Sequence, residues 1–137
     1  MTWKHILICA TFWTISACDH SEKGISASER LDTFYETDMP ESNLIPYLVA
    51  GGPEMLPLLV KAVQNTELKK RRYLIGALGE FIDDRAVSVL SQIALSPEEV
   101  DYIKCDALQS LKKIMNKQSF DEMIELWGAN SKICDQY

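Results

Sequence analysis

Cysteine and histidine, which often act as nucleophile and general base, are few and far apart in this chain. Its 137 residues include four cysteines and two histidines. General acid–base catalysis needs convergent groups with tuned acidity, but His20 is the only histidine after the apolar run that ends at Ile15. A Ser–His or Cys–His nucleophile is therefore not expected, and we predict that the chain is not an enzyme.

Adjacent carboxylates are the other candidates for acid–base or metal chemistry. Each pair stands where a helix is expected to begin, at Asp83-Asp84, Glu98-Glu99 and Asp121-Glu122. Acids at a helix N-terminus stabilise it by about 0.3–1 kcal/mol through the dipole, so we interpret these pairs as structural.

No histidine or further cysteine lies at zinc-ligand spacing. Gly76 and Gly79 lack the strand-to-helix context of a phosphate loop and are expected to allow close helix packing. We therefore expect neither a metal nor a cofactor.

The N-terminal region has the composition of an export signal. Lys4 supplies a basic start, residues 6–15 form an apolar run, and Ser16 and Ala17 precede Cys18. A charged start, a short apolar core and small residues before the cleavage point are typical of signal peptides. The run is too short to span a bilayer, which takes about 20 apolar residues.

The segment Ile15-Ser16-Ala17-Cys18 resembles the lipobox of bacterial lipoproteins. The resemblance implies that residues 1–17 are a signal peptide and that lipid is attached to the sulfur of Cys18. Residues 18–27 would then be a flexible tether to a domain spanning 28–137, held on the periplasmic side of a bacterial membrane. Asp19 is similar to the residue that retains many enterobacterial lipoproteins at the inner membrane, which favours that membrane.

The expected mature chain is acidic and of single-domain size. Loss of residues 1–17 would leave 120 residues with 13 basic and 20 acidic side chains, a formal charge of −7. An acidic chain argues against nonspecific binding to nucleic acid or anionic lipid headgroups. The remaining thiols, Cys105 and Cys134, could form a disulfide in an oxidising periplasm. Alternatively, Cys105 is a small buried hydrophobe and Cys134 a free thiol, and the sequence leaves both options open.

Amphipathic helices account for most of the remaining residues. A capping box at Ser26 and Glu29 predicts a helix at about 28–37, and a second short helix is predicted at 44–50, with Pro46 in its first turn. Apolar residues then recur at i, i+1, i+3, i+4, i+7 and i+8 in five segments, which begin at Met55, Leu74, Ala86, Ala107 and Phe120. Further capping boxes are predicted at Ser96–Glu99 and Ser119–Glu122. Strand signals are absent, so the predicted fold class is all-α.

The five segments keep step with one another, which indicates repeated helix pairs. The distances between alternate segments are 31 residues for Met55 to Ala86, 33 for Leu74 to Ala107 and 34 for Ala86 to Phe120. Residues 71–87, RRYLIGALGEFIDDRAV, resemble a HEAT repeat, with Leu-Gly near the end of one helix and an acidic turn before the next. The resemblance covers about residues 41–128. It implies a short right-handed α-solenoid of about three HEAT-like helix pairs that binds other macromolecules.

Four consecutive cations, Lys69-Lys70-Arg71-Arg72, stand at the start of a predicted helix and oppose its dipole. They form either a solvated face or a partner-binding face in which Arg71 or Arg72 also pairs with a nearby aspartate. The candidate aspartates are Asp83, Asp84 and Asp106. Trp127 is either a packed end-cap aromatic or a partner anchor. Four tyrosines at the edges of apolar stripes could add interface area, namely Tyr35, Tyr47, Tyr73 and Tyr102.

Together these features predict a membrane-anchored, non-catalytic protein-binding scaffold or assembly factor of the bacterial cell envelope. The alternative is an immunity-type inhibitor that neutralises a basic periplasmic toxin, which the acidic balance suits. A third hypothesis draws on bilin lyases, which contain similar repeats, but the scarcity of histidine disfavours such an enzyme. The expected partners are the membrane, through lipid on Cys18, and another protein. Nucleic acid is not an expected partner.

Overall fold

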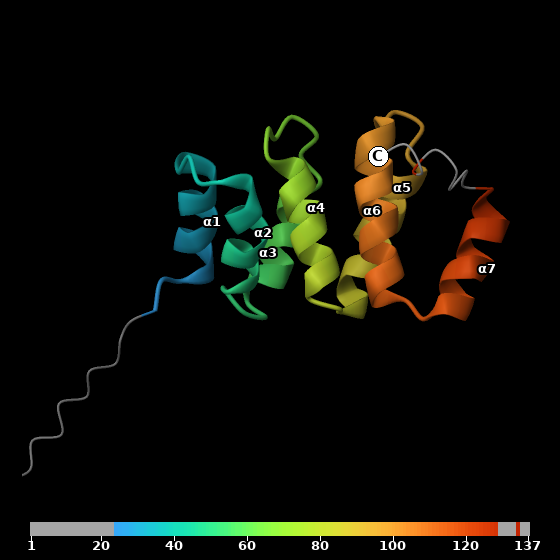
Figure 1. Cartoon of the computed structure of the whole chain (residues 1–137), viewed down its shortest axis with the longest axis horizontal. Coiled ribbons are helices and arrows are strands. Elements are labelled where there is room, and N and C mark those ends of the chain that lie inside the picture. Colours follow the sequence, from blue (N-terminus) through green and yellow to red (C-terminus); the bar gives the residue numbers. More distant parts are fainter. Residues whose placement is uncertain (1–23, 129–133, 135–137) are drawn as a thin grey trace, which may run out of the picture.

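A computed structural model describes residues 24–128 and Cys134, and the fold in this part of the chain is all-α. Seven α-helices and one short 3₁₀ helix, η1, follow one another without a strand. Their bounds are α1 Ala27–Glu36, α2 Glu41–Val49, α3 Met55–Ala62, α4 Arg71–Glu80, η1 Asp84–Ala86, α5 Val87–Leu95, α6 Asp101–Ile114 and α7 Lys117–Trp127. Figure 1 shows them in a row along the longest axis, with α1 at one end and α7 at the other. The predicted all-α class is confirmed. None of these helices combines the length and apolar composition that crossing a membrane requires.

The predicted apolar segments lie largely in helices and supply most of the core. They fall in α3, in α4, in η1 with α5, in α6 and in α7. One cluster of buried side chains runs from Ala27 in α1 to Met123 in α7. The two N-terminal helices join it through Phe34 and Leu48, which are completely buried. Burial of a large aliphatic side chain contributes roughly 1.5–3 kcal/mol, so this shared core is the main source of stability.

The first two helices begin close to their predicted positions. Ser26 caps α1 as a capping box, because its side chain accepts the Glu29 N–H while the Glu29 carboxylate accepts the Ser26 N–H. α2 begins at Glu41, three residues earlier than predicted, so Pro46 lies inside the helix rather than in its first turn. Pro46 has no N–H to donate to the carbonyl of Ser42. Ser42 is exposed, and water can satisfy that carbonyl.

Two predicted capping boxes are wrong. Ser96 and Glu99 form a turn closed by a backbone hydrogen bond of 3.3 Å, and α6 begins two residues later. The Glu99 carboxylate binds Arg71 instead of capping a helix. At α7 the N-cap is Asn116, whose Oδ1 accepts the Ser119 N–H at 2.9 Å, so Ser119 lies inside the helix.

Alternate helices contact one another along the row. α1 packs on α3, α2 on α4, and α4 on α6, while α3 also packs on α4 and α5 on α6. Gly79 permits the close approach of α4 to α6, because a Cβ there would lie 2.8 Å from the Cα of Ser110. Ser110 is buried, and its hydroxyl donates to the carbonyl of Ile75 at 2.9 Å. Close packing is the role predicted for Gly79.

Ile82 departs from the predicted apolar stripe. α4 ends at Glu80, and Ile82 adopts a left-handed backbone with φ 49°. The change of direction takes its side chain out of helical phase and leaves it 67% exposed. A β-branched residue rarely adopts this conformation, so the turn before η1 carries backbone strain.

Candidate functional site

The described residues hold no group of three or more His, Cys, Asp or Glu side chains placed to bind a metal ion. The Asp83-Asp84 pair illustrates what such carboxylates do in this fold. Asp83 accepts the backbone N–H of Arg85 at 2.9 Å and also binds its guanidinium. These hydrogen bonds lower the pKa of Asp83 to about 2. A carboxylate with so low a pKa is a weak base, and Asp83 serves as the N-cap of η1.

The four-cation run contains one buried member, Arg71, which lies at the first position of α4. Its side chain is only 7% exposed, and its guanidinium is paired with the Glu99 carboxylate, itself 11% exposed. The Nε of Arg71 also donates to the carbonyl of Val63 at 2.6 Å. Arg71 therefore joins the end of α3 to the loop between α5 and α6. It is not available to a partner, so the predicted four-cation face loses this residue.

Lys70 is also committed within the fold. Its ammonium donates to the carbonyls of Phe34 at 2.9 Å and Thr37 at 2.8 Å, at the end of α1. The same nitrogen lies 5.4 Å from the centre of the Phe34 ring. A cation that binds the last carbonyls of a helix complements the negative end of its dipole. Lys70 thus caps α1. This role explains why a cation stands at the start of α4, where it opposes the dipole of that helix.

Arg72 points outward from the same helix turn, and its side chain is 52% exposed. Its guanidinium carbon lies 5.8 Å from the ring centre of Tyr73 and 5.9 Å from that of Tyr102. The Nε of Arg72 lies 3.3 Å from Oδ2 of Asp106. This oxygen has no aligned hydrogen bond, so the contact is chiefly electrostatic. Of the three aspartates considered as partners, the structure places Asp106 beside Arg72.

The Asp106 carboxyl group that pairs with Arg72 is partly buried. Burial raises the pKa of its carboxyl group, and the positive charge of Arg72 only partly opposes that rise. Burial thus disfavours the ionised form of Asp106 relative to an aspartate in water. The printed contact of Arg72 with Asp106 is made by Nε, and the Arg72 side chain stays 52% exposed.

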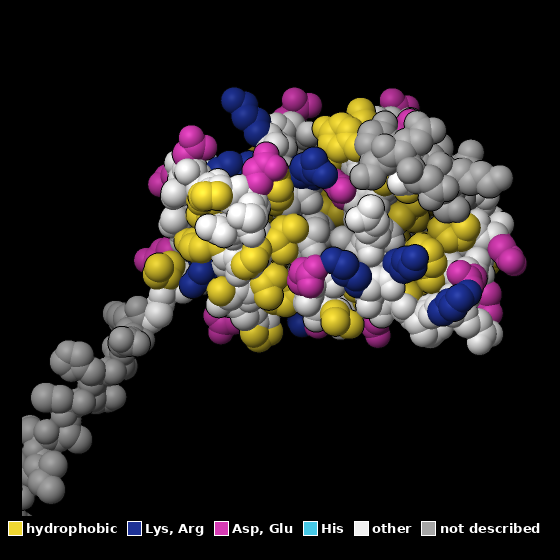
Figure 2. Space-filling model, viewed as in Figure 1, with side chains coloured by type: hydrophobic (Ala, Val, Ile, Leu, Met, Phe, Trp, Pro, Cys, Tyr) yellow, Lys and Arg dark blue, Asp and Glu magenta, His cyan; other side chains and the backbone are white. Residues whose placement is uncertain are grey.

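Lys69 and Arg72 border a groove of about 230 Å³ where the α3–α4 loop meets the α5–α6 loop. Val100 and Tyr102 also line the groove and are 49% and 45% exposed. The charged residues of the lining are three cations and Glu99. The groove therefore carries a formal charge of +2 in a chain whose total is −6. Figure 2 shows that Lys and Arg are interspersed with Asp and Glu over one face of the molecule.

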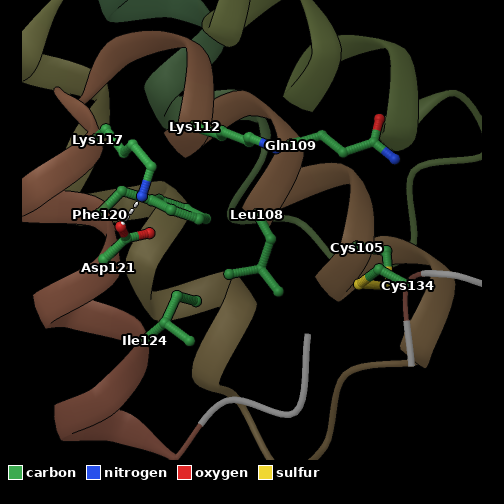
Figure 3. Close-up of a pocket in the computed structure, with 9 residues that line it drawn as sticks. All are labelled: Cys105, Leu108, Gln109, Lys112, Lys117, Phe120, Asp121, Ile124 and Cys134. Atoms are coloured by element: carbon green, nitrogen blue, oxygen red, sulfur yellow. Dashed lines mark hydrogen bonds and ion pairs between the residues drawn. A yellow bond between two sulfur atoms is a disulfide. The ribbon is translucent and has the colours of Figure 1, made fainter. Parts of the chain in front are cut away.

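A second hollow, of about 700 Å³, lies between α6 and α7. Figure 3 shows Leu108, Phe120 and Ile124 from the two helices around it, with the ion pair of Lys117 and Asp121 at its edge. The Asp121-Glu122 pair is thus part of the surface of α7 and caps no helix. α7 still joins the shared core through Met123, which is buried.

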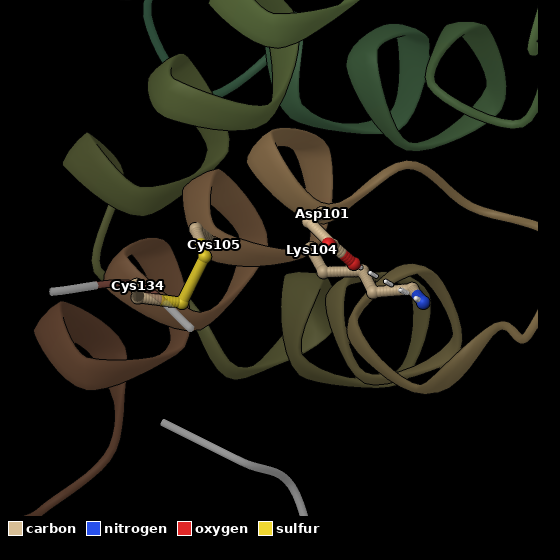
Figure 4. Close-up of a disulfide and its surroundings, with 4 residues drawn as sticks. All are labelled: Asp101, Lys104, Cys105 and Cys134. Atoms are coloured by element: carbon tan, nitrogen blue, oxygen red, sulfur yellow. Dashed lines mark ion pairs between the residues drawn. A yellow bond between two sulfur atoms is a disulfide. The ribbon is translucent and has the colours of Figure 1, made fainter. Parts of the chain in front are cut away.

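Cys105 and Cys134 form a disulfide, with their Cα atoms 5.3 Å apart. Figure 4 shows the bridge beside the ion pair of Asp101 and Lys104 on α6. Cys105 is 1% exposed. The bridge therefore ties the segment that follows α7 to the core side of α6. Of the two options that the sequence left open, the structure has the disulfide.

Several predicted site residues lie outside the described part of the chain. These are the lipobox residues Ile15, Ser16 and Ala17, the lipidation site Cys18, and the side chain of Trp127. Among the described residues, sequence reasoning missed Glu99 and Val100. The spacing of Glu99 from Ser96 fits a capping box, and nothing local distinguishes a cap from a long-range ion pair.

Comparisons with protein-family models, with curated proteins and with solved structures give no match to this chain.

Proposed function

We propose that this chain is a membrane-anchored, non-catalytic protein-binding scaffold or assembly factor on the periplasmic side of a bacterial membrane, with the inner membrane favoured by Asp19. The lipid on Cys18 would hold the helical domain at the membrane surface. Two or more acyl chains give durable anchoring. Confinement to a surface raises the effective concentration of the domain toward partners on the same surface.

The same proposal assigns the helices to a short right-handed α-solenoid of about three HEAT-like pairs. Its support is the spacing of 31 to 34 residues between matching apolar segments and the packing of α2 on α4 and α4 on α6. Repeats that contact mainly their neighbours form extended stacks whose exposed surfaces bind other proteins.

The observation that carries the proposal is the groove beside Arg72. Val100 and Tyr102 are large apolar side chains that remain exposed next to two cations, although a single core cluster buries most of the other apolar residues. Tyrosine and arginine are enriched at protein–protein interfaces. A volume of about 230 Å³ is small beside ligand cavities, which span roughly 300–1,000 Å³. The groove suits side chains of a partner better than a cofactor.

The anchoring half of the proposal can be tested with radiolabelled palmitate. The full chain, tagged after Tyr137, should incorporate label and fractionate with membranes, and Cys18→Ser should abolish both. Cys9→Ser is the matched control, because Cys9 lies within the predicted signal peptide and should leave labelling unchanged. Unlabelled wild-type chain, or equal labelling of Cys18→Ser, would remove the lipid anchor from the proposal.

The acidic balance supports a second candidate function, an immunity-type inhibitor of a basic periplasmic toxin. The mature charge would be −7, and opposite charge speeds association with a cationic protein. A toxin gene adjacent to the gene for this chain is the expected genetic context. Co-expression should then restore growth, and failure to protect against the neighbouring product would exclude this role.

A further inference from the structure

The charge of the groove beside Arg72 is opposite to that of the chain as a whole. Its lining carries Lys69, Arg71, Arg72 and Glu99, a formal +2, whereas the chain carries −6. Arg71 and Glu99 neutralise each other as an ion pair. The remaining cations of the lining are Lys69 and Arg72, which are both exposed, and Asp106 approaches Arg72 only at its Nε. The positive groove lies in a chain of net negative charge. A ligand that the groove attracts must therefore be recognised at short range.

Arg72 is well placed to bind a carboxylate. Asp106 approaches only its Nε, and within the described residues its terminal nitrogens have no hydrogen-bond partner. A guanidinium can bind a carboxylate through two parallel N–H donors. The rings of Tyr73 and Tyr102 lie within 6 Å of the guanidinium and restrict its position. The donor is thus held in place before a ligand arrives, which lowers the entropy lost on binding.

The groove is also lined by exposed apolar side chains. Val100 stands in the loop before α6, and Tyr102 lies in the first turn of that helix. Both are about half exposed. An apolar side chain that packs here would lie beside a carboxylate bound to Arg72, because one groove is lined by all three residues.

We propose that the groove formed by Lys69, Arg72, Val100 and Tyr102 binds an acidic segment of a partner protein. An Asp or Glu carboxylate would accept hydrogen bonds from Arg72 and Lys69, and a neighbouring large apolar residue would pack against Val100 and Tyr102. This inference rests on the proposed protein-binding function and specifies its partner.

A polyanion such as nucleic acid fits the groove less well. Its affinity comes from many phosphate contacts spread over a basic surface, and here two exposed cations are surrounded by an acidic chain. The field of two cations is screened beyond about 8 Å at physiological salt. A short peptide with one or two carboxylates can bind within this distance.

The test is an array of random twelve-residue peptides probed with the full chain in detergent micelles. Three proteins are compared: the wild type, Lys69→Gln/Arg72→Gln, and the control Lys61→Gln/Lys112→Gln, which loses the same charge at exposed positions in α3 and α6. The wild type and the control should select peptides with Asp or Glu next to a large apolar residue. Hydrogen bonds to charged groups contribute about 1.5–3 kcal/mol, so the groove variant should bind these peptides about 10- to 100-fold more weakly. Circular dichroism should show that all three remain helical.

Three outcomes would overturn the inference. They are selection of basic peptides, equal binding by the groove variant and the control, and absence of any selected peptide. Affinity capture from solubilised membranes tests the proposed protein-binding function independently of the groove. A partner captured by the wild type and by the groove variant alike would retain protein binding and exclude this groove, whereas capture of no partner by any variant would count against the function itself.

Discussion

Replacement of Arg71 by methionine should destabilise the protein more than any other change in the four-cation run. Methionine keeps an unbranched apolar side chain but removes the guanidinium. Glu99, 11% exposed, would be left without a partner, and the carbonyl of Val63 would lose a donor at 2.6 Å. Breaking a buried ion pair by removal of one partner costs about 3–5 kcal/mol. That loss is a large part of the 5–15 kcal/mol typical of a folded domain.

Urea denaturation followed by circular dichroism measures the effect, and a double-mutant cycle isolates its cause. Arg71→Met, Glu99→Leu and the double variant are compared with the wild type. The double variant leaves no buried charge and should recover at least about 1.5 kcal/mol relative to the sum of the single losses, since apolar replacement of a buried pair is often neutral. Arg72→Met is the adjacent control. Its pair with Asp106 is exposed on one side, so the change should cost about 0–1 kcal/mol.

Two results would contradict a buried cross-link between Arg71 and Glu99. If Arg71→Met lowered the free energy of unfolding by less than about 1 kcal/mol, the guanidinium would not be a buried cross-link between α3 and the α5–α6 loop. If the losses in Arg71→Met and Glu99→Leu simply added in the double variant, the two side chains would not act as a pair.

Five further changes should each give a separable result. Gly79→Ala should lower the free energy of unfolding by about 1–3 kcal/mol, because the new Cβ would overlap the backbone of α6. At Gly76 only the end of a flexible side chain is in the way, so Gly76→Ala should change that free energy by less than about 1 kcal/mol in the same urea assay. Cys134→Ser should cost about 3–4 kcal/mol, the entropic value for a loop spanning 29 residues, and reductant should lower the melting temperature of the wild type only. Ile82→Gly should raise the melting temperature, since glycine adopts φ 49° without the strain of about 1–3 kcal/mol that isoleucine carries there; a lower value would contradict this. Asp106 has a folded-state pKa above its ordinary 3.8, so its ionisation at higher pH disfavours the folded state, and Asp106→Asn should stabilise the protein in urea near pH 7 but not near pH 3.

Most helices could be predicted because their signal is local and repeated. The apolar segments that begin at Met55, Leu74, Ala107 and Phe120 all begin inside helices of the structure. The residue at which a helix begins was harder to predict where one side chain could either cap the helix or pair with a distant residue. Glu99 stands three residues after Ser96 and fits a capping box by spacing alone, yet it pairs with Arg71, 28 residues away in sequence. The partner that wins such a competition depends on the packing of several helices.

The candidate site was predictable only in part for the same reason. The run Lys69-Lys70-Arg71-Arg72 is one motif in the sequence but has three roles in the structure. Arg71 faces the core, Lys70 caps α1, and the other two face solvent. Local spacing identifies the run as unusual. It does not reveal that carbonyls at the end of α1, 33 to 36 residues away, receive Lys70.

The buried cation and the exposed one are neighbours on one helix. Successive side chains of an α-helix point about 100° apart, so Arg71 can bind Val63 and Glu99 while Arg72 remains exposed beside the groove. The two neighbours should therefore fail in different ways. Loss of Arg71 removes stability from the stack as a whole, whereas loss of Arg72 leaves the fold intact and removes only the recognition of a carboxylate. A partner-binding defect without a change in the free energy of unfolding is the signature that separates a recognition residue from the cross-link beside it.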